Sequence, residues 1–432
     1  MDGIKIFGMD TNRIARLAAQ PRWFRALNRR ALVTVQWLVH AVKGTRFGQQ
    51  LISRLNQASK AVGNRRSLIS VSNASGAPKI GIIIPEYVKT DVRIYAIVDK
   101  AKELGFLAPV FTTAREITNG TDTSDFKAVL VRRDGVDFQY ATKLLTHLHK
   151  SGIRLVVDLD DDMLSDENRD RLVKDGNYTL DALAALTELC QHADQIISST
   201  EPLAKTIAQF TDAPIEVFPN LLDPKTWAPL HTPKNRKLAS RVPKTKTRLL
   251  YFGTLGRSGD LEVIKNLPTQ IEMATKHKTI VELLGITTDK LPKGFDSLIT
   301  MNFPYHEFVA YLKGQANRWE VGLAPLAENT YNNARSDLKL LEYAALGIPA
   351  VASRVGPYYN ADDLAVLVEN SAAEWCAAVE KLLTDATYAQ ERVTKAQEVV
   401  LHTRMVTADA ARRWANLVLG NESQTAFAEF VG

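Results

Sequence analysis

Short apolar runs and amphipathic stretches alternate along most of the chain. The run Ile80–Pro85 is unbroken, as in a strand of a parallel sheet that is buried on both faces. Asp91–Leu104 follows with the spacing of a helix and meets Gly105. Further strand and helix patterns follow in turn up to the strand IEVFPN, which ends at Asn220. This alternation predicts a parallel sheet covered by helices on both faces, in a domain over residues 79–228.

The alternation stops between residues 229 and 248. This segment holds three prolines and seven basic residues but no acid, which is typical of an exposed connection between domains. The positive charges of this segment have two interpretations: they are simply solvated, or they form a cationic hinge near a phosphate site. The segment is therefore predicted to be a linker that follows the first domain.

A second series of strand and helix patterns starts directly after the linker. It opens with the strand RLLYFGT and predicts a second sheet domain over residues 249–399. A helical pattern runs from Tyr388 to Leu419, and the part over 400–432 is expected to return toward the first domain. The predicted fold class is α/β, with two Rossmann-like, doubly wound domains. Such domains bind ligands at the carboxyl ends of their strands, so the candidate site lies in a cleft between those ends.

Residues 1–78 differ from the rest of the chain in charge. Within 1–66, 13 Lys or Arg stand against two acids, a net charge of +11, which leaves 6 − 11 = −5 for the remainder. The apolar run Ala31–Val42 is shorter than the about 20 residues that span a bilayer, and no cleavage site of a secretory signal follows a charged start. We predict a basic helical extension that lies on an anionic membrane surface, packs on the main body or is simply solvated.

Composition and motifs exclude several classes of protein. No recognition motif accompanies the basic charge, so a nucleic-acid partner is not expected. Only Cys190 and Cys376 occur, which excludes a disulfide framework and favours a cytoplasmic protein, peripheral on the plasma membrane if the extension binds lipid. Phosphate loops, paired-histidine zinc motifs and nucleophile elbows are absent from the sequence. Pro85 follows the first strand in place of a glycine fingerprint, which argues against a dinucleotide enzyme.

The stretch Tyr331–Tyr358 carries the most chemical information. Its helix pattern ends at Gly347, and its spacing places Ser336, Lys339 and Glu342 on the side opposite to the apolar stripe. Free amides and the dipole at the amino end attract an anion, and Lys339 adds a positive charge one turn further. Glu342, two turns in, is suited to accept hydrogen bonds from a pair of vicinal hydroxyls. The pattern predicts a nucleotide diphosphate as the ligand.

The same stretch resembles the donor-binding signature of bacterial glycosyltransferases with the GT-B fold, in the branch related to the family-four retaining enzymes. The matching residues are YNNARS, Lys339, LEYAALGIPAVAS and GPY. YFGTLGRSGDL and FPNLLDPKTW are similar to further segments of that family, and LVVDLDDD resembles an acidic strand end found in part of it. The resemblance covers about residues 79–420 and not the first 70.

The resemblance implies transfer of a sugar from a nucleotide diphosphate sugar to a hydroxyl, with no metal and no cofactor besides the donor substrate. Glu342 would hold the ribose hydroxyls, and Arg257, Arg335 and Lys339 would stabilise the departing diphosphate. The implied donor-binding residues are Gly253, Thr254, Asp260, Gly285, Asn332, Arg335, Ser336, Lys339 and Glu342. Many relatives carry a second glutamate where this chain has Ala334. Contacts to the sugar then fall to Asn332, Asn333 or another group, and retention or inversion stays open.

A cluster of acids follows the strand pattern LVVDL, namely Asp158, Asp160, Asp161 and Asp162. At the carboxyl end of a strand they would activate or orient an acceptor hydroxyl, bind a cation, or cap the next helix. We assign a catalytic role to Asp158 and Asp160, beside Lys339 and Arg257. The acceptor side is assigned to Glu86, Arg132, Arg133 and Asp161. The two arginines either bind an acidic or lipid-phosphate acceptor or neutralise the aspartates.

These residues and the resemblance together lead to a functional expectation. We expect a hexosyltransferase-like enzyme, retaining and metal-independent, that acts on a glycan or lipid-linked acceptor in the assembly of a capsule, lipopolysaccharide or related cell-surface polysaccharide. The alternatives are a non-catalytic partner subunit with the same fold and a nucleotide-sugar epimerase. Glu342, Lys339 and Asp260 favour the enzyme, whereas Ala334 keeps the non-catalytic subunit open.

Overall fold

The structure is a computed structural model of the 432-residue chain. It describes residues 76–85, 92–174, 178–230, 246–253, 258–286, 291–299 and 305–421. The chain divides into two compact units, Met1–Asn73 and Ala74–Gly432, and every described residue belongs to the second. The basic extension and three predicted site residues, Glu86, Thr254 and Arg257, lie outside the described residues.

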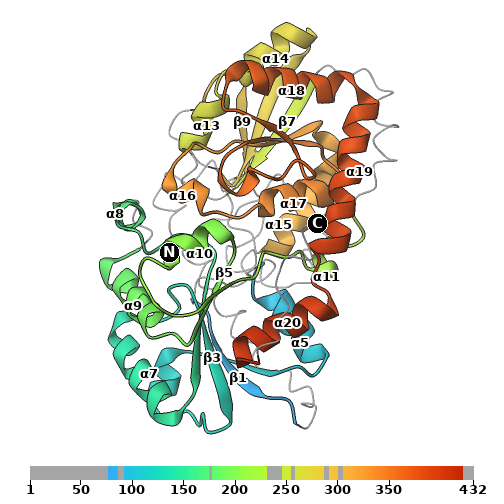
Figure 1. Ribbon diagram of the computed structural model, residues 1–432. Coiled ribbons are helices and arrows are strands. Elements are labelled where there is room, and N and C mark those ends of the chain that lie inside the picture. Colours follow the sequence, from blue (N-terminus) through green and yellow to red (C-terminus); the bar gives the residue numbers. More distant parts are fainter. Residues whose placement is uncertain are drawn as a thin grey trace, which may run out of the picture. The chain divides into compact units, whose positions relative to one another are not determined.

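The first lobe is built on a parallel six-stranded sheet in the order β2-β1-β3-β4-β5-β6 (Figure 1). Its strands are β1 (Lys79–Ile83), β2 (Ala108–Thr112), β3 (Phe126–Arg132), β4 (Arg154–Leu159), β5 (Gln195–Ser198) and β6 (Ile215–Val217). Its helices are α5 (Tyr95–Glu103), α6 (Ala114–Thr118), α7 (Phe138–Ser151), α8 (Asp166–Lys174), α9 (Leu180–Gln191), α10 (Glu201–Ile207) and α11 (Pro224–Trp227). The predicted alternation of parallel strands and helices is confirmed.

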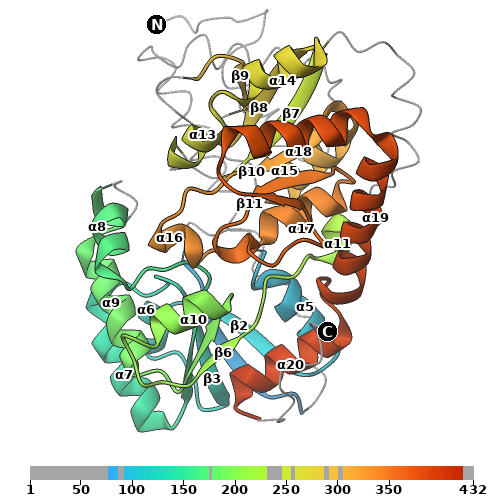
Figure 2. The same cartoon turned by 45° about the horizontal axis from the view of Figure 1, so that its top comes forward.

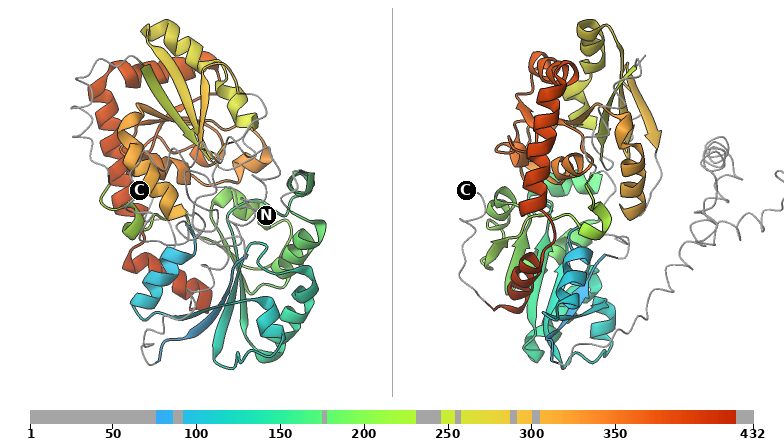
Figure 3. Two further views of the ribbon diagram at one scale, coloured as in Figure 1. Left: turned by 180° about the vertical axis from the view of Figure 1, so that it is seen from behind. Right: turned by 90° about the vertical axis from the view of Figure 1, so that its right-hand side faces the viewer.

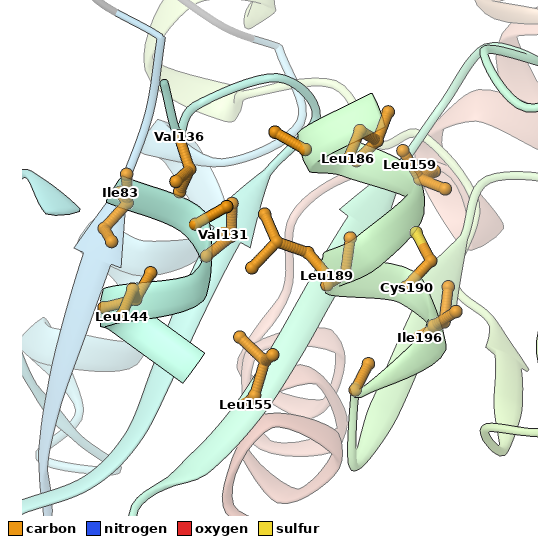
Figure 4. Close-up of a cluster of buried hydrophobic side chains, with 14 of the residues drawn as sticks. Ile83, Val131, Val136, Leu144, Leu155, Leu159, Leu186, Leu189, Cys190 and Ile196 are labelled. Atoms are coloured by element: carbon orange, nitrogen blue, oxygen red, sulfur yellow. The ribbon is translucent and has the colours of Figure 1, made fainter. Parts of the chain in front are cut away.

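Apolar side chains cover both faces of this sheet. On one face, Leu144 of α7 and Leu189 of α9 belong to the same buried cluster as Val131 of β3 (Figure 4). Ile83 of β1 belongs to that cluster too, whereas Ile80 of the same strand belongs to the cluster on the other face. Side chains along a strand alternate between faces, so a strand buried on both sides needs an unbroken apolar run.

The C-terminal helix α20 (Ala408–Leu419) covers the first lobe. Its buried residues Trp414 and Val418 share an apolar cluster with Ile97 of α5, and the two helices lie side by side in Figures 1 and 3. The chain reaches α20 from the long helix α19 (Ala386–Thr403). The helical pattern predicted from Tyr388 to Leu419 is therefore two helices, because the chain passes from one lobe to the other between them.

The second lobe holds another parallel six-stranded sheet, in the order β12-β11-β10-β7-β8-β9 (Figure 2). Its strands are β7 (Lys246–Phe252), β8 (Lys278–Leu284), β9 (Phe295–Ile299), β10 (Val321–Ala324), β11 (Ala350–Ser353) and β12 (Val366–Val368). Its helices are α13 (Ser258–Ile264), α14 (Leu267–Thr275), α15 (Tyr305–Gln315), α16 (Thr330–Asn333), α17 (Leu338–Ala345), α18 (Ala372–Thr384) and α19, with 3₁₀ turns at Ala316–Arg318 and Gly356–Tyr358. The second predicted sheet is confirmed as well.

Several elements differ from the sequence prediction. The strand β2 was not predicted; it contains Pro109 and lies at a sheet edge, where the missing N–H is tolerated. The spacing of apolar residues from Leu261 to His277 predicts one helix, but the structure has two, α13 and α14, because Pro268 lies in the first turn of α14 and starts a new helix. The strand β7 begins at Lys246, so the second sheet starts 249 − 246 = 3 residues before the predicted domain boundary.

Each sheet has one point at which the strand order reverses. In the first sheet, β1 lies between β2 and β3; in the second, β7 lies between β8 and β10. Ligands of doubly wound folds bind outside the carboxyl ends of the strands at such a point. The loops after β7 and β10 therefore belong to the candidate site in the second lobe, and the loops after β1 and β3 in the first.

The two passages of the chain between the lobes pair with each other. The amide of Leu222 donates to the carbonyl of Arg404 at 2.8 Å, and the amide of Val406 donates to the carbonyl of Leu222 at 3.0 Å. Leu222 and Met405 thus form a parallel bridge between the two segments. Both connections are held together at one point, next to the residues that follow β6.

Candidate functional site

The stretch from Thr330 to Gly347 forms two short helices, α16 and α17, where the sequence predicts one. Gly347 follows α17 with a φ of 65°, which confirms the predicted left-handed stop. Ser336 precedes α17, so the prediction that it shares a helical face with Lys339 and Glu342 was wrong. Asp337 occupies the N-cap position of α17 without a side-chain hydrogen bond to the helix, because its carboxylate is paired with Arg404.

Glu342 lies on α17 and is 6% exposed. Its Oε1 accepts a hydrogen bond from the hydroxyl of Tyr305 at 2.7 Å, and that hydroxyl accepts one from Nε1 of Trp227 at 3.2 Å. Burial raises the pKa of Glu342 to about 7, although the Tyr305 hydrogen bond and the charge of Lys339 lower it. The carboxyl group is therefore oriented by a neighbour and titrates near neutral pH.

Lys339 lies one turn earlier on α17 and is 7% exposed. Its ammonium group donates to the carbonyl of Phe252, the last residue of β7. It also lies 4.4 Å from the centre of the Tyr251 ring, within cation–π distance. The positive charge of Lys339 is thus held at the carboxyl end of β7, where the strand order of the second sheet reverses.

Asp260 and Asn332, both predicted to bind the donor, contact each other. Oδ1 of Asp260 accepts from Nδ2 of Asn332 and from the amide of Ala327, each at 2.9 Å. Nδ2 of Asn332 also donates to the carbonyl of Ala327 at 2.7 Å. Both N–H groups of the Asn332 amide are therefore engaged in holding the loop after β10. Asn333, the other predicted substitute for the missing glutamate, is exposed.

Gly253 and Gly285 bring the ends of β7 and β8 together. The amide of Gly253 donates to the carbonyl of Leu284 at 3.0 Å. Gly285 has a φ of 72°, and a Cβ there would collide with the carbonyl oxygen of Gly253. Glycine at 285 is therefore required both by the backbone conformation and by the close approach. Thr254 and Arg257, the next predicted donor contacts, lie outside the described residues.

The acidic strand end of the first lobe is neutralised by two arginines. Arg132 forms an ion pair with Asp160 at 2.6 Å, and Arg133 contacts Asp160 at 2.5 Å and also pairs with Asp161. The arginines hold the pKa of Asp160 well below its usual range, although burial alone would raise it. These ion pairs match the interpretation in which Arg132 and Arg133 neutralise the aspartates.

Asp158 and Asp162 have structural contacts of their own. Asp158 is fully buried. Its two carboxylate oxygens accept hydrogen bonds from Nε of Arg93 at 2.8 and 2.9 Å, and Oδ1 also lies 3.5 Å from Nε of Arg132. In this structure it is therefore out of reach of an acceptor. Asp162 accepts from the amides of Leu164 and Ser165, each at 3.1 Å, as a residue that turns the chain toward α8. Among the described residues, no group of three or more acids, histidines or cysteines is arranged to hold a metal ion.

Loops at the carboxyl ends of the two sheets contact each other. The hydroxyl of Thr200, after β5, is 3.4 Å from the carbonyl oxygen of Ala334, and Ala334 shares a buried cluster with helix α10. On α8, Glu167 accepts from the hydroxyl of Thr330 at 2.9 Å, and the guanidinium of Arg171 lies 3.7 Å from the centre of the Tyr331 ring. Figures 1 and 2 show α16 beside α8 and α10. The carboxyl ends of the two sheets therefore face the same region.

Arg335 and Ser336 lie in this region between the lobes. Nη1 of Arg335 donates to the hydroxyl of Tyr331 at 2.8 Å. Burial lowers the pKa of Arg335, but Tyr331, Asp161 and other nearby groups raise it above its usual value. The hydroxyl of Ser336 accepts from Nδ2 of Asn220, from the segment after β6, at 2.9 Å. Both residues are thus near the predicted site, each with a protein partner.

Several residues that hold this site in place are not predicted by the sequence pattern. Arg404 donates to both carboxylate oxygens of Asp337, at 2.6 and 2.7 Å, and to the carbonyl of Asn220 at 3.2 Å. Arg93, Tyr305 and Trp227 belong to the same group. Asn220 and Trp227 stand in the segment FPNLLDPKTW, which was recognised by resemblance. Neither spacing nor motif distinguishes Arg404 or Tyr305 from other residues of their type.

Comparisons with known proteins identify the architecture. No family model matches the sequence, and a search of curated proteins finds no match. Among solved structures, HepE of Anabaena in complex with UDP and glucose superposes with a TM-score of 0.54 at 12% identity, covering 80% of this chain and 100% of HepE. HepE in complex with UDP-glucose gives 0.52 at 11% identity with the same coverage.

The chain has the GT-B fold. The expectation of two Rossmann-like domains in a GT-B arrangement is thereby confirmed. At 12% identity the likeness establishes the GT-B architecture and not an activity. Within this GT-B chain, Lys339 lies at the reversal point of the second sheet, with Glu342 one turn further along α17, and the paired aspartates lie at the carboxyl end of a strand in the first sheet.

Proposed function

We propose that the chain is a glycosyltransferase that transfers a sugar from a nucleotide diphosphate sugar to a hydroxyl acceptor. The observation that carries this proposal is the pair Lys339 and Glu342, both buried, one turn apart on α17, with the lysine against the end of β7. A cation and a carboxylate at this spacing match a diphosphate and a ribose diol. HepE, which shares the fold, has been solved with UDP, glucose and UDP-glucose, which supports a nucleotide diphosphate sugar as the donor.

Each donor-side group has a role in the proposed reaction. The carboxylate of Glu342 accepts hydrogen bonds from the ribose hydroxyls. The ammonium of Lys339 stabilises the negative charge that grows on the diphosphate as its bond to the anomeric carbon breaks. The absence of a side chain at Gly253 lets the backbone approach the phosphates. Thr254, Arg257 and Arg335 complete the diphosphate site in this proposal.

The acceptor contributes the oxygen that forms the new bond to the anomeric carbon as the bond from that carbon to the diphosphate breaks, and the proton of the acceptor hydroxyl passes to the departing diphosphate. Asp160 and Asp161 are proposed to orient this hydroxyl, with Arg132 and Arg133 holding the carboxylates in place. Glu86 is proposed as a further acceptor contact. Transfer without a metal and with retention of configuration belongs to the same proposal, as does a glycan or lipid-linked acceptor in cell-surface polysaccharide assembly.

A transfer assay with the full chain tests the proposed function. UDP- and GDP-linked sugars are incubated with the protein and with membrane-lipid acceptors, and the expected result is acceptor-dependent release of nucleoside diphosphate together with a labelled lipid. Donor binding without transfer to any acceptor would indicate the non-catalytic subunit instead. Interconversion of donor sugars without an acceptor would indicate the epimerase.

Replacing Glu342 by alanine is expected to weaken nucleoside diphosphate binding about 10-fold or more, because hydrogen bonds to a buried carboxylate are lost. The dissociation constant, measured by titration calorimetry, reports the effect. Glu307, an exposed acid on α15 of the same lobe, supplies the control: Glu307→Ala should bind like the unmodified chain. Equal affinity of Glu342→Ala and the control would contradict the assignment of Glu342.

We also propose that the basic segment 1–66, with its net charge of +11, binds an anionic membrane surface and places the enzyme at the cytoplasmic face of the plasma membrane. Within the described ranges, no helix is both long and apolar enough to traverse a bilayer. Deleting 1–66 is expected to remove the protein from anionic liposomes in a flotation assay, and neutral liposomes serve as the control. Equal flotation of the full and shortened chains on anionic liposomes would remove this proposal.

A further inference from the structure

A chain of three side chains ends on Glu342. Nε1 of Trp227 donates to the hydroxyl of Tyr305 at 3.2 Å, and that hydroxyl donates to Oε1 of Glu342 at 2.7 Å. Tyr305 is the first residue of α15, whereas Trp227 closes α11 and is fully buried. The two aromatic rings are 6.5 Å apart and tilted by 58°. The indole N–H only donates and an ionised Glu342 only accepts, so the Tyr305 hydroxyl accepts from Trp227 and donates to the carboxylate.

The groups around Tyr305 and Glu342 favour donation from the tyrosine hydroxyl to the carboxylate. Burial raises the pKa of Tyr305 well above its usual value, and Glu342 and Asp223 add to this effect, so the hydroxyl stays protonated. The groups that act on Glu342 are Tyr305 from α15 and Lys339 from α17, and both favour the ionised carboxylate. Among the described residues, Oε1 is the only oxygen of Glu342 that accepts a protein hydrogen bond. Oε2 therefore remains for a ligand.

We propose that Tyr305 is a positioning residue for the nucleotide: its hydroxyl aligns the Glu342 carboxylate, so that a vicinal diol meets an acceptor already in place. This inference rests on the proposed function, because it takes the ligand of Glu342 to be a ribose. It adds a residue from a different helix, 37 positions away in the sequence. An aligned and ionised acceptor costs less to organise on binding than a mobile one.

Binding of UDP and GDP to the full chain, measured by calorimetry between about pH 5.5 and 8.5, tests this role. In the unmodified protein, affinity should rise with pH through about 7, where Glu342 ionises. Tyr305→Phe keeps the ring but removes the donor, so affinity at pH 7 should fall about 10-fold and the midpoint should move to higher pH. Trp227→Phe should shift the pH midpoint of binding less, because Trp227 contacts Tyr305 and acts on Glu342 only through it.

Two controls make the readout specific. Tyr311→Phe removes a hydroxyl from the same helix α15 and should leave both affinity and midpoint unchanged. A 2′,3′-dideoxy nucleoside diphosphate lacks the diol and should bind the unmodified chain and Tyr305→Phe equally. A purely structural role for Tyr305 would lower the melting temperature and leave the pH midpoint in place.

The outcomes separate this inference from the proposed function. If the unmodified chain binds neither UDP nor GDP, the proposed function fails and the inference falls with it. If the unmodified chain binds and Tyr305→Phe, folded by its melting temperature, shows the same affinity and the same midpoint, the inference alone is overturned. A shifted midpoint together with the loss of diol discrimination supports it.

Discussion

Replacing Lys339 by methionine is expected to lower the turnover number about 100- to 1,000-fold while the chain stays folded. In the proposed reaction this ammonium faces the charge that develops on the departing diphosphate, in a buried position where such an interaction is strong. Methionine has a similar length and fills the space beside Tyr251 and Phe252. Removing Lys339 takes a nearby positive charge from the buried Glu342, but the pKa of Glu342 is about 7 and the carboxylate can take up a proton, so the chain should lose some stability without unfolding. Steady-state transfer rates and the melting temperature measure the two expectations.

Lys313 offers a matched control for Lys339. It lies on α15 of the same lobe and also donates to backbone carbonyls, those of Thr226 and Trp227 at 3.2 and 3.1 Å. Lys313→Met should therefore affect stability rather than turnover per folded molecule. A Lys339→Met variant that turns over as fast as Lys313→Met would remove Lys339 from the catalytic machinery.

The strands were predictable where their burial leaves a trace in the sequence. β1 is buried on both faces and appears as an unbroken apolar run, and β3 carries such a run from Ala128 to Val131. β2 lies at the sheet edge, contains Pro109 and is only partly buried, so its pattern is weak. α8 was missed for a similar reason, since only Asn168 and Leu172 are buried in it. Patterns of hydrophobicity report burial, and elements with little burial leave little pattern.

The candidate site was predictable only in part. Lys339 and Glu342 follow from their spacing on one helix and from resemblance. Their partners do not, because Phe252 is 87 positions from Lys339 and Tyr305 is 37 from Glu342. The sequence also placed both residues on an open helix face, whereas α17 is buried nearly all round. Whether a polar side chain is exposed or buried against another element depends on tertiary packing, which helical periodicity does not contain.

Replacing Arg93 by methionine is expected to lower the free energy of unfolding by about 3–5 kcal/mol, because it leaves a buried carboxylate without its main partner. Arg93 and Asp158 have side chains that are 2% and 0% exposed. Urea denaturation at pH 7 measures the loss. Lys381→Met breaks the exposed pair with Asp385 at 2.7 Å and serves as the control, with a much smaller expected effect.

The pH dependence distinguishes a lost ion pair from lost packing. Burial raises the pKa of Asp158 above its usual value of 3.8, although Arg93 and Arg132 lower it. Because the pKa of Asp158 is higher in the folded than in the unfolded state, its contribution to stability is fully present below the unfolded-state pKa. That contribution is lost as the pH rises through the folded-state pKa. Arg93→Met raises the pKa of Asp158 in the folded state further. The loss in the free energy of unfolding relative to the unmodified chain should therefore be largest at neutral pH and shrink toward pH 4. Adding Asp158→Asn should restore stability at pH 7 in the Arg93→Met background, since no charge is then left unpaired. A deficit that is the same at every pH, and that Asp158→Asn does not relieve, would assign the loss to packing.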